Sequence, residues 1–362
     1  MKIKELMPML QLHGRTVWDE NREALFANWS CSGFTVRFKG SELKIKLIAM
    51  SDQIPGFPGM PTPPPDWPCF GVVCDGSELS GRTHMNVEEG EYVIFSGEEG
   101  EHELRFVKLS ENARGKLGVT ELETDGEFLP AQAEKKPLIE IIGDSITCGF
   151  GNEAPDNAFE FKTSEENGWM SYAAQAAREL GWEWNMVCES GICACKPENP
   201  MFPMHAMEDI YQFSDELYET KAGIKPQSWD FAANPAKAVV ISLGTNDSNP
   251  IRFYQNFDEI EGMEQWFRKQ YKKFVCEVRR LNCPDTFIVC ALGSMDYYLY
   301  HIIRDVVQEI KEETGDTNIC SFEFIPINVM MEGFGAAGHP SAKTHARMGR
   351  ELAACIRKYV KA

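Results

Sequence analysis

The leading candidate for a catalytic residue in this sequence is a serine that directly follows an apolar run. Ser145 follows the run 138–142 and Gly143, so it can stand exposed at the start of a helix. Backbone N–H groups at such a position favour negative charge developing on an oxygen atom. The sequence therefore predicts Ser145 as a nucleophile that attacks a carbonyl group.

Two further apolar runs end in groups that could stabilise the resulting oxyanion. Gly191 follows the run 184–188 and offers an unshielded backbone N–H, while Asn246 follows the run 238–243 and offers a side-chain amide. With the N–H of Ser145 they would make three donors. Loss of one such donor typically costs about 2.7–4 kcal/mol of transition-state stabilisation.

The base expected for this chemistry is His339, which lies between Gly338 and Pro340 directly before the final helical segment. It is well placed to take a proton from Ser145. His205 is the second candidate for the base, and His345 is expected on the surface or in the packing of the last helix. Asp247 is expected to anchor a loop.

The segments that carry these residues alternate between strands and helices from residue 136 onward. Strands are expected at 138–142, 184–188, 238–243, 286–292 and 320–325, and helices at 169–180, 260–281, 297–314 and 342–359. Apolar strands separated by helices predict a parallel sheet with a helix layer on each face, which is a three-layer α/β/α domain. Ligands of such sheets bind beyond the carboxyl ends of the strands.

The segment before residue 130 has a different pattern. Apolar and polar residues alternate in 34–38 and 43–47, and 39–41 between them predicts the turn of an antiparallel hairpin. Several further short strands predict a β-sandwich, and the proline-rich stretch 55–68 is expected to be a stiff surface loop, with a lid or partner contact as the alternative.

Length and composition limit the class of protein. A chain of 362 residues predicts two domains, here 1–130 and 131–362. A net charge of −19 argues against nucleic acid or anionic membrane as a partner. No secretory signal is visible and the 12 cysteines are expected to be reduced, which favours a cytoplasmic location. Cys188, Cys193 and Cys195 lack a zinc-binding spacing, and neither a metal nor a cofactor is expected.

The order Ser145, Gly191, Asn246, His339 resembles that of the SGNH or GDSL hydrolases over most of residues 137–360. Gly14-Arg15-Thr16, Trp229-Asp230-Phe231 and the preceding β-domain make the chain similar to carbohydrate esterase family two. Those enzymes join a jelly-roll domain to the hydrolase domain and remove acetyl groups from plant polysaccharides such as xylan and glucomannan. The resemblance implies Ser145 as nucleophile, His339 as base, and Ser145, Gly191 and Asn246 as the oxyanion hole.

The sequence departs from the SGNH pattern beside the histidine. An aspartate usually lies two or three residues before it, but Ala337 and Ala336 occupy these positions here. We therefore expect a Ser–His dyad in which a backbone carbonyl of loop 331–338 orients His339. Glu332 curling back to His339 is the less favoured alternative.

Together these features predict a serine esterase that removes acetyl groups from xylan-, mannan- or glucomannan-type oligosaccharides through an acetyl-enzyme. Two other functions stay open at this stage. One is a carbohydrate-binding protein with an inert hydrolase domain, and the other is a lipid or thioester hydrolase of the same fold.

Overall fold

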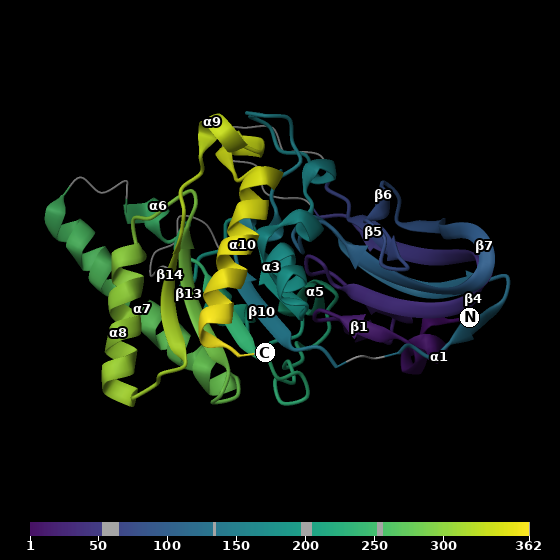
Figure 1. Cartoon of the computed structure of the whole chain (residues 1–362), viewed down its shortest axis with the longest axis horizontal. Helices are drawn as coiled ribbons and strands as arrows, with labels where there is room; N and C mark the ends of the chain where they lie inside the picture. Colours follow the sequence, from purple (N-terminus) through teal and green to yellow (C-terminus); the bar gives the residue numbers. More distant parts are fainter. Residues whose placement is uncertain (53–64, 133–134, 197–204, 252–255, 362) are drawn as a thin grey trace.

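The computed structural model describes residues 1–52, 65–132, 135–196, 205–251 and 256–361. Most of the proline-rich stretch 55–68 lies outside these residues. An antiparallel sheet and a three-layer domain lie side by side (Figure 1). The last antiparallel strand ends at Leu129 and the first parallel strand begins at Leu138. Within the described residues, the helices are too short or too polar to cross a lipid bilayer.

The antiparallel domain is one curled sheet of nine strands, in the order β2-β3-β8-β4-β7-β5-β6 with β1 and β9 paired to β4. Its inward side chains form a core of their own, which includes Phe34, Phe38, Phe70 and Phe106. The elements are α1 (Ile3–Leu6), η1 (Met7–Met9), β1 (Gln11–His13), β2 (Val17–Asp19), β3 (Ala24–Phe26), β4 (Gly33–Met50), β5 (Cys69–Cys74), β6 (Ser80–His84), β7 (Glu89–Lys108), β8 (Lys116–Thr124) and β9 (Glu127–Leu129).

The hairpin expected around residues 39–41 is wrong, because this segment lies inside the single long strand β4. The pairing of β4 with β7 shifts register between Gly40 and Glu42, and Gly40 lies opposite Gly100. Asp125 accepts hydrogen bonds from the N–H groups of Ser41 and Glu42 at 2.8 and 3.1 Å, which satisfies donors exposed by this irregularity. A β-bulge therefore bends one strand where a turn was predicted.

The second domain contains a parallel five-stranded sheet in the order β11-β10-β12-β13-β14, which confirms the fold class predicted from the sequence. The strand that carries Ser145 at its end, β10, is flanked by the strands that lead to Gly191 and Asn246. The chain passes from β10 to β11 on one side and then to β12 on the other side. Such a switch of direction creates a crevice at the carboxyl ends of the strands. The strands are β10 (Leu138–Gly143), β11 (Glu183–Cys188), β12 (Ala238–Ser242), β13 (Phe287–Gly293) and β14 (Ile319–Phe324).

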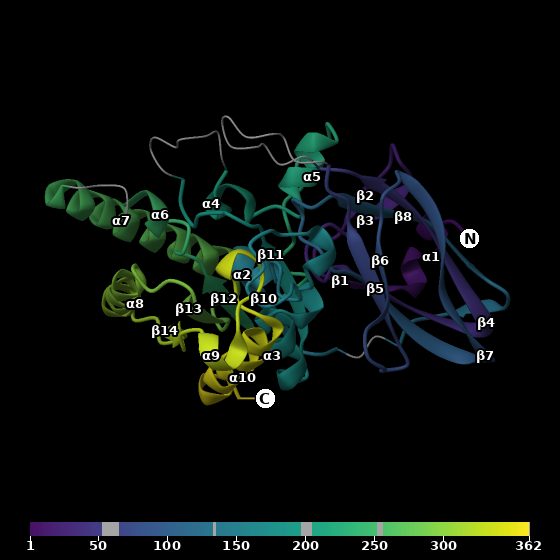
Figure 2. The same cartoon turned by 90° about the horizontal axis from the view of Figure 1, so that it is seen from above.

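Helices α7 and α8 lie on one face of this sheet, and α3 and α10 lie on the other (Figures 1 and 2). Successive side chains of β12 alternate between the faces: Val239 and Ile241 pack with α7 and α8, while Ala238 and Val240 pack with α3 and α10. The helices are α2 (Ser145–Cys148), α3 (Tyr172–Leu180), α4 (Met207–Ile210), α5 (Glu216–Lys221), α6 (Ser248–Ile251), α7 (Phe257–Leu281), α8 (Tyr300–Thr314), α9 (Val329–Glu332) and α10 (Ala342–Tyr359), with shorter turns η2 (Thr163–Glu165), η3 (Gly168–Met170) and η4 (Ala336–Gly338).

An arginine of the antiparallel domain is buried inside the parallel domain. The Arg15 guanidinium donates to both carboxylate oxygens of Glu140 on β10, at 3.0 and 3.2 Å, and both side chains are almost fully buried. Its remaining group donates to the carbonyl oxygens of Tyr211 and Phe213. The guanidinium also lies over the rings of Trp229 and Phe231, each 5.2 Å away. The motifs Gly14-Arg15-Thr16 and Trp229-Asp230-Phe231, more than 200 residues apart in the sequence, therefore meet at the guanidinium of Arg15.

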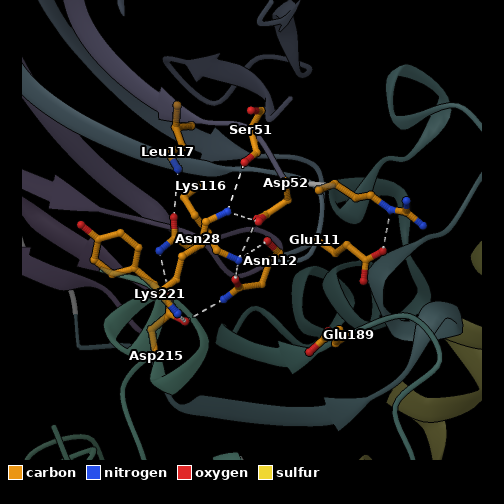
Figure 3. A network of polar contacts seen from close by, with 12 residues as sticks. Asn28, Ser51, Asp52, Glu111, Asn112, Lys116, Leu117, Glu189, Asp215 and Lys221 are labelled. Atoms are coloured by element: carbon orange, nitrogen blue, oxygen red, sulfur yellow. Dashed lines mark hydrogen bonds and ion pairs between the residues drawn. The ribbon is translucent and has the colours of Figure 1, made fainter. Parts of the chain in front are cut away.

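Buried polar contacts join the domains at a second place, around Asp215 (Figure 3). Asp215 accepts hydrogen bonds from the side-chain amides of Asn28 and Asn112, at 2.7 and 2.8 Å. Burial raises the pKa of the Asp215 carboxyl, and the nearby charge of Lys116 opposes this. The ammonium group of Lys116 donates to the Asn112 carbonyl at 2.7 Å and pairs with Asp52 at 3.1 Å. The buried hydrogen bonds of Asp215 with Asn28 and Asn112 fix the relative position of the two domains.

Candidate active site

Ser145 is the first residue of the four-residue helix α2, directly beyond the carboxyl end of β10. The Asp144 side chain caps this helix by accepting a hydrogen bond from the Ile146 N–H at 3.0 Å. Burial raises the pKa of Asp144 to about 7. Gly143 is required before this turn, because a Cβ there would lie 1.9 Å from the Thr147 hydroxyl. The local sequence thus places the Ser145 hydroxyl at the edge of the sheet, 8% exposed.

The structure brings His339 into contact with Ser145. Nε2 of His339 lies 3.0 Å from the Ser145 hydroxyl, and Nδ1 lies 3.1 Å from the carbonyl oxygen of Ala336. Because a carbonyl can only accept, Nδ1 carries the proton and Nε2 accepts from the serine. Burial lowers the pKa of His339 below its ordinary value, and the carbonyls of Ala336 and Ala337 partly offset this. The imidazole is therefore neutral near pH 7, as a base must be.

The carbonyl that holds His339 belongs to Ala336, three residues earlier, which is one of the two positions where the SGNH pattern leads one to expect an aspartate. The loop is fixed by backbone hydrogen bonds: the Ala336 N–H donates to Gly151 O at 3.0 Å, and the Gly335 N–H donates to His339 O at 2.8 Å. A Cβ at Gly151 would lie 2.3 Å from the Ala336 side chain, so the close approach of these two segments needs glycine.

Glu332 is held away from the histidine. Its carboxylate accepts hydrogen bonds from Arg347 at 2.6 and 2.9 Å and from the Thr344 hydroxyl at 3.1 Å. The Arg347 guanidinium lowers the pKa of Glu332 to about 2. This geometry ties Glu332 to α10 and leaves the Ala336 carbonyl as the partner of His339 Nδ1.

The two other residues expected in the oxyanion hole lie at the same edge of the sheet. Gly191 has a positive φ of 82°, and a Cβ built on it meets nothing within 4 Å. One amide N–H of Asn246 donates to the Ile192 carbonyl at 3.0 Å, directly beside Gly191. An amide has a second N–H, which this bond does not use.

Asp247 anchors the loop beside the site. Its two carboxylate oxygens accept hydrogen bonds from the N–H groups of Ala194 and Cys195, at 2.9 and 3.3 Å. Burial raises the pKa of Asp247 to about 6. This arrangement holds the turn after β11 against the turn after β12, which agrees with the loop-anchoring role expected from the sequence.

His205, the second candidate for the base, and His345 have partners elsewhere. His205 Nε2 lies 2.8 Å from Glu189, whose hydrogen bond raises the pKa of His205. His345 is fully buried on α10, where Nδ1 accepts from the Tyr172 N–H at 3.1 Å, and burial lowers its pKa to about 3. His345 therefore belongs to the packing between α3 and α10.

A carboxylate of the antiparallel domain, Glu111, reaches this site, and it lies in no sequence motif that could have identified it. Glu111 is fully buried; one of its oxygens accepts from the Ser190 N–H and the Cys148 thiol, and the other accepts from Arg114 at 3.1 Å. It thus lies between the helix that begins with Ser145 and the turn that holds Gly191. Its negative charge raises the pKa of His339 and so favours the imidazolium form.

Aromatic rings pack against the imidazole ring of His339. The Phe150 ring lies 4.4 Å from the His339 ring and stacks on Phe161 at 3.9 Å. The Arg114 guanidinium covers Phe161 at 4.4 Å. Arg114 therefore links the antiparallel domain to the rings that position the imidazole.

All 12 cysteines lie within the described residues and are free. Cys188, Cys193 and Cys195 are buried. The described residues contain one cluster of three groups close enough to share a metal ion, formed by Cys74, Asp75 and His102 on the antiparallel sheet. It lies outside the catalytic loops.

A three-layer α/β/α domain with a serine after its first strand, in contact with a histidine before its last helix, defines a hydrolase domain of the SGNH or GDSL class. Residues 139–352 match the family described as GDSL-like Lipase/Acylhydrolase, and residues 12–131 match Carbohydrate esterase 2 N-terminal. The chain therefore belongs to the GDSL-like lipase/acylhydrolase family and carries the N-terminal domain of carbohydrate esterase family two. The resemblance predicted from the sequence is confirmed.

Relatives of this chain are named esterases. It is 30% identical over 335 residues to cellulase/esterase CelE of Acetivibrio thermocellus, covering 91% of this chain and 37% of CelE. It is 26% identical over 231 residues to an acetylxylan esterase/glucomannan deacetylase of Cellvibrio japonicus, covering 61% of each. The chain thus spans less than two thirds of the length of these two curated relatives.

Solved structures extend this similarity over nearly the whole chain. A family two carbohydrate esterase from Clostridium thermocellum, in complex with cellohexaose, matches with a TM-score of 0.80 and 28% identity, covering 96% of this chain and 98% of that one. An acetyl xylan esterase, Est2A from Butyrivibrio proteoclasticus, has the same fold, with a TM-score of 0.83 and 22% identity over 99% of this chain and 97% of that one.

Proposed function

We propose that this protein is a serine esterase that removes O-acetyl groups from plant-derived oligosaccharides of the xylan, mannan or glucomannan type. The observation that carries the proposal is the hydrogen bond of 3.0 Å between Ser145 and a neutral His339, in a chain whose relatives are named acetylxylan esterases. The bound cellohexaose of the Clostridium thermocellum neighbour supports a carbohydrate as the substrate.

The proposed reaction runs through an acetyl-enzyme. Ser145 Oγ attacks the acetyl carbonyl while His339 Nε2 takes its proton, and the N–H groups of Ser145, Gly191 and Asn246 stabilise the oxyanion. The bond to the sugar oxygen then breaks, and His339 gives its proton to the departing hydroxyl. Water, deprotonated by His339, attacks the acetyl-Ser145 ester, and the bond between the acyl carbon and Ser145 Oγ breaks. Acetate is released, and His339 returns the proton to Ser145 Oγ. A dyad oriented by the Ala336 carbonyl can complete both steps, because a carbonyl fixes the required tautomer.

Release of acetate from a panel of acetylated xylo-, manno- and gluco-oligosaccharides tests this function. We expect acetate from at least one acetylated sugar and little hydrolysis of long-chain lipid esters or thioesters. Preference for long acyl chains would indicate a lipid or thioester hydrolase. Binding of oligosaccharide without acetate release would indicate a carbohydrate-binding protein with an inert hydrolase domain.

A further inference from the structure

A second cleft opens between the two domains, at the edge of the parallel sheet opposite to Ser145. It has a volume of about 750 Å³ and is lined by residues of both domains. Glu183, at its wall, begins the six-residue strand β11, whose other end leads to Gly191. A strand rises roughly 3.3 Å per residue, so the cleft lies about 20 Å from the catalytic edge. Its volume is in the range of small-molecule sites.

The wall of this cleft contains a positive charge without a negative partner. Among the described residues, Arg178 on α3 forms no ion pair, and its buried Nη1 has no hydrogen-bond acceptor. Its guanidinium lies over the Trp169 ring at 4.4 Å. Nε and Nη2 of Arg105 are also buried without acceptors. Burial, together with the charge of Arg105, lowers the pKa of Arg178 to about 10. Arg178 is half-buried, and cations withdrawn from water are normally paired, so its unpaired Nη1 favours an anion nearby.

The half-buried carboxylate of Glu183, at the wall of the cleft, already has partners. Glu183 lies 3.0 Å from His13 Nδ1 and 3.0 Å from Arg105 Nη1. Burial alone would raise the pKa of Glu183, but His13 and Arg105 lower it to about 2. Burial lowers the pKa of His13, which leaves this ring neutral near pH 7.

The charged groups of the cleft sum to a positive value. Arg105, Arg178 and Lys136 line it, against Glu103 and Glu183. This excess is unusual in a chain whose net charge is −19. Positive charge held in a concave site between low-dielectric walls raises the local concentration of anions.

We propose that this cleft is a second binding site, which takes a small sugar through a carboxylate or phosphate group bound by Arg178. A guanidinium binds either oxyanion through parallel N–H donors. The cleft is larger than a free phosphate needs, and Gln11 and Gln132 at its wall can donate to and accept from sugar hydroxyls. The site is independent of the esterase reaction.

Calorimetric titration with glucuronic acid, glucose 6-phosphate and uncharged glucose tests the site. We expect saturable binding of at least one charged sugar and none of glucose, with affinity that falls as salt is added. Tighter binding of glucuronic acid would identify a carboxylate ligand, and tighter binding of glucose 6-phosphate a phosphate ligand. Absence of binding by both charged sugars, or equal binding of glucose, would overturn the proposal.

Variants of Arg178 locate the binding. Arg178→Gln should weaken the charged sugar at least tenfold, and Arg178→Lys, which keeps the charge but not the forked donor, should have an intermediate effect. Arg280→Gln removes an equal charge from an exposed pair with Glu277 and should leave the affinity unchanged. Among the described residues Arg178 has no acidic partner that its replacement would leave unpaired, so both variants should fold. Unchanged binding in folded Arg178→Gln would place the ligand elsewhere, for example on the oxyanion-hole donors.

Discussion

Replacing Arg15 by methionine tests how strongly the antiparallel domain is tied to the catalytic domain. The change removes the partner of Glu140, which lies on the strand that leads to Ser145, and both side chains of this pair are almost fully buried. Glu140 would keep only the hydroxyl of Tyr211 and the amide of Asn185, at 2.7 and 3.3 Å. Removal of one partner from a buried ion pair costs about 3–5 kcal/mol.

That cost is large relative to the total stability of a protein, about 5–15 kcal/mol. For a chain of 362 residues it corresponds to a fall in Tm of roughly 4–7 °C. Thermal and denaturant unfolding would measure the loss. Activity well below Tm should stay near that of the parent, because Arg15 contacts neither Ser145 nor His339.

Two further variants isolate the ion pair. Arg280→Met breaks an exposed pair with Glu277 and should cost less than about 1 kcal/mol. Arg15→Met combined with Glu140→Met should lose less stability than the two single changes added together, because no unpaired charge remains. Equal losses in Arg15→Met and Arg280→Met, or additive losses in the double variant, would show that the buried pair of Arg15 and Glu140 does not couple the two domains.

Three further predictions concern the catalytic loops. Asn246→Ala should lower kcat by about 10²–10³-fold with little change in KM, because its amide is needed most when the oxygen is charged; a raised KM with unchanged kcat would make it a substrate contact instead. The value of kcat/KM should rise with pH through a midpoint below 6.5, because burial lowers the pKa of His339 and only the neutral ring accepts a proton. A midpoint above 6.5 would contradict this prediction. Glu332→Gln should keep kcat within about tenfold of the parent, which corresponds to roughly 1.4 kcal/mol of activation barrier, because the Glu332 carboxylate is bound by Arg347. A thousandfold loss in a folded variant would mean that Glu332 completes a triad.

The three-layer domain could be predicted closely because its strands are short apolar runs buried on both faces. The final helix, expected at 342–359, has those bounds in the structure, and α7 begins three residues earlier than expected, at Phe257. The order of the strands in the sheet was not predicted, because the sequence pattern itself does not give it.

The antiparallel domain was harder to predict at one point. Residues 39–41 have the composition of a turn, and the same composition suits a bulge. What decides between them is the pairing of Gly40 with Gly100 and the contacts of Asp125, which are all distant in sequence.

The site was predictable to the extent that each residue follows a strand or precedes a helix. Ser145, Gly191, Asn246 and His339 could be proposed in this way, and the structure places them at one edge of the sheet. Glu111 and Arg114 could not, because they reach the site from a loop of the other domain. Glu111 contacts Ser190, 79 residues away in the sequence, and neither lies in a motif that would predict the contact.

Acetate release by Ser145→Ala, measured beside the parent on the acetylated oligosaccharide that the parent hydrolyses best, tests whether Ser145 is the nucleophile. His205→Ala is the matched control, since His205 pairs with Glu189 and does not contact Ser145. We expect folded Ser145→Ala to lose nearly all acetate release, at least about a thousandfold, and His205→Ala to keep it. Acetate release near the parent rate by a well-folded Ser145→Ala variant would show that Ser145 is not the nucleophile.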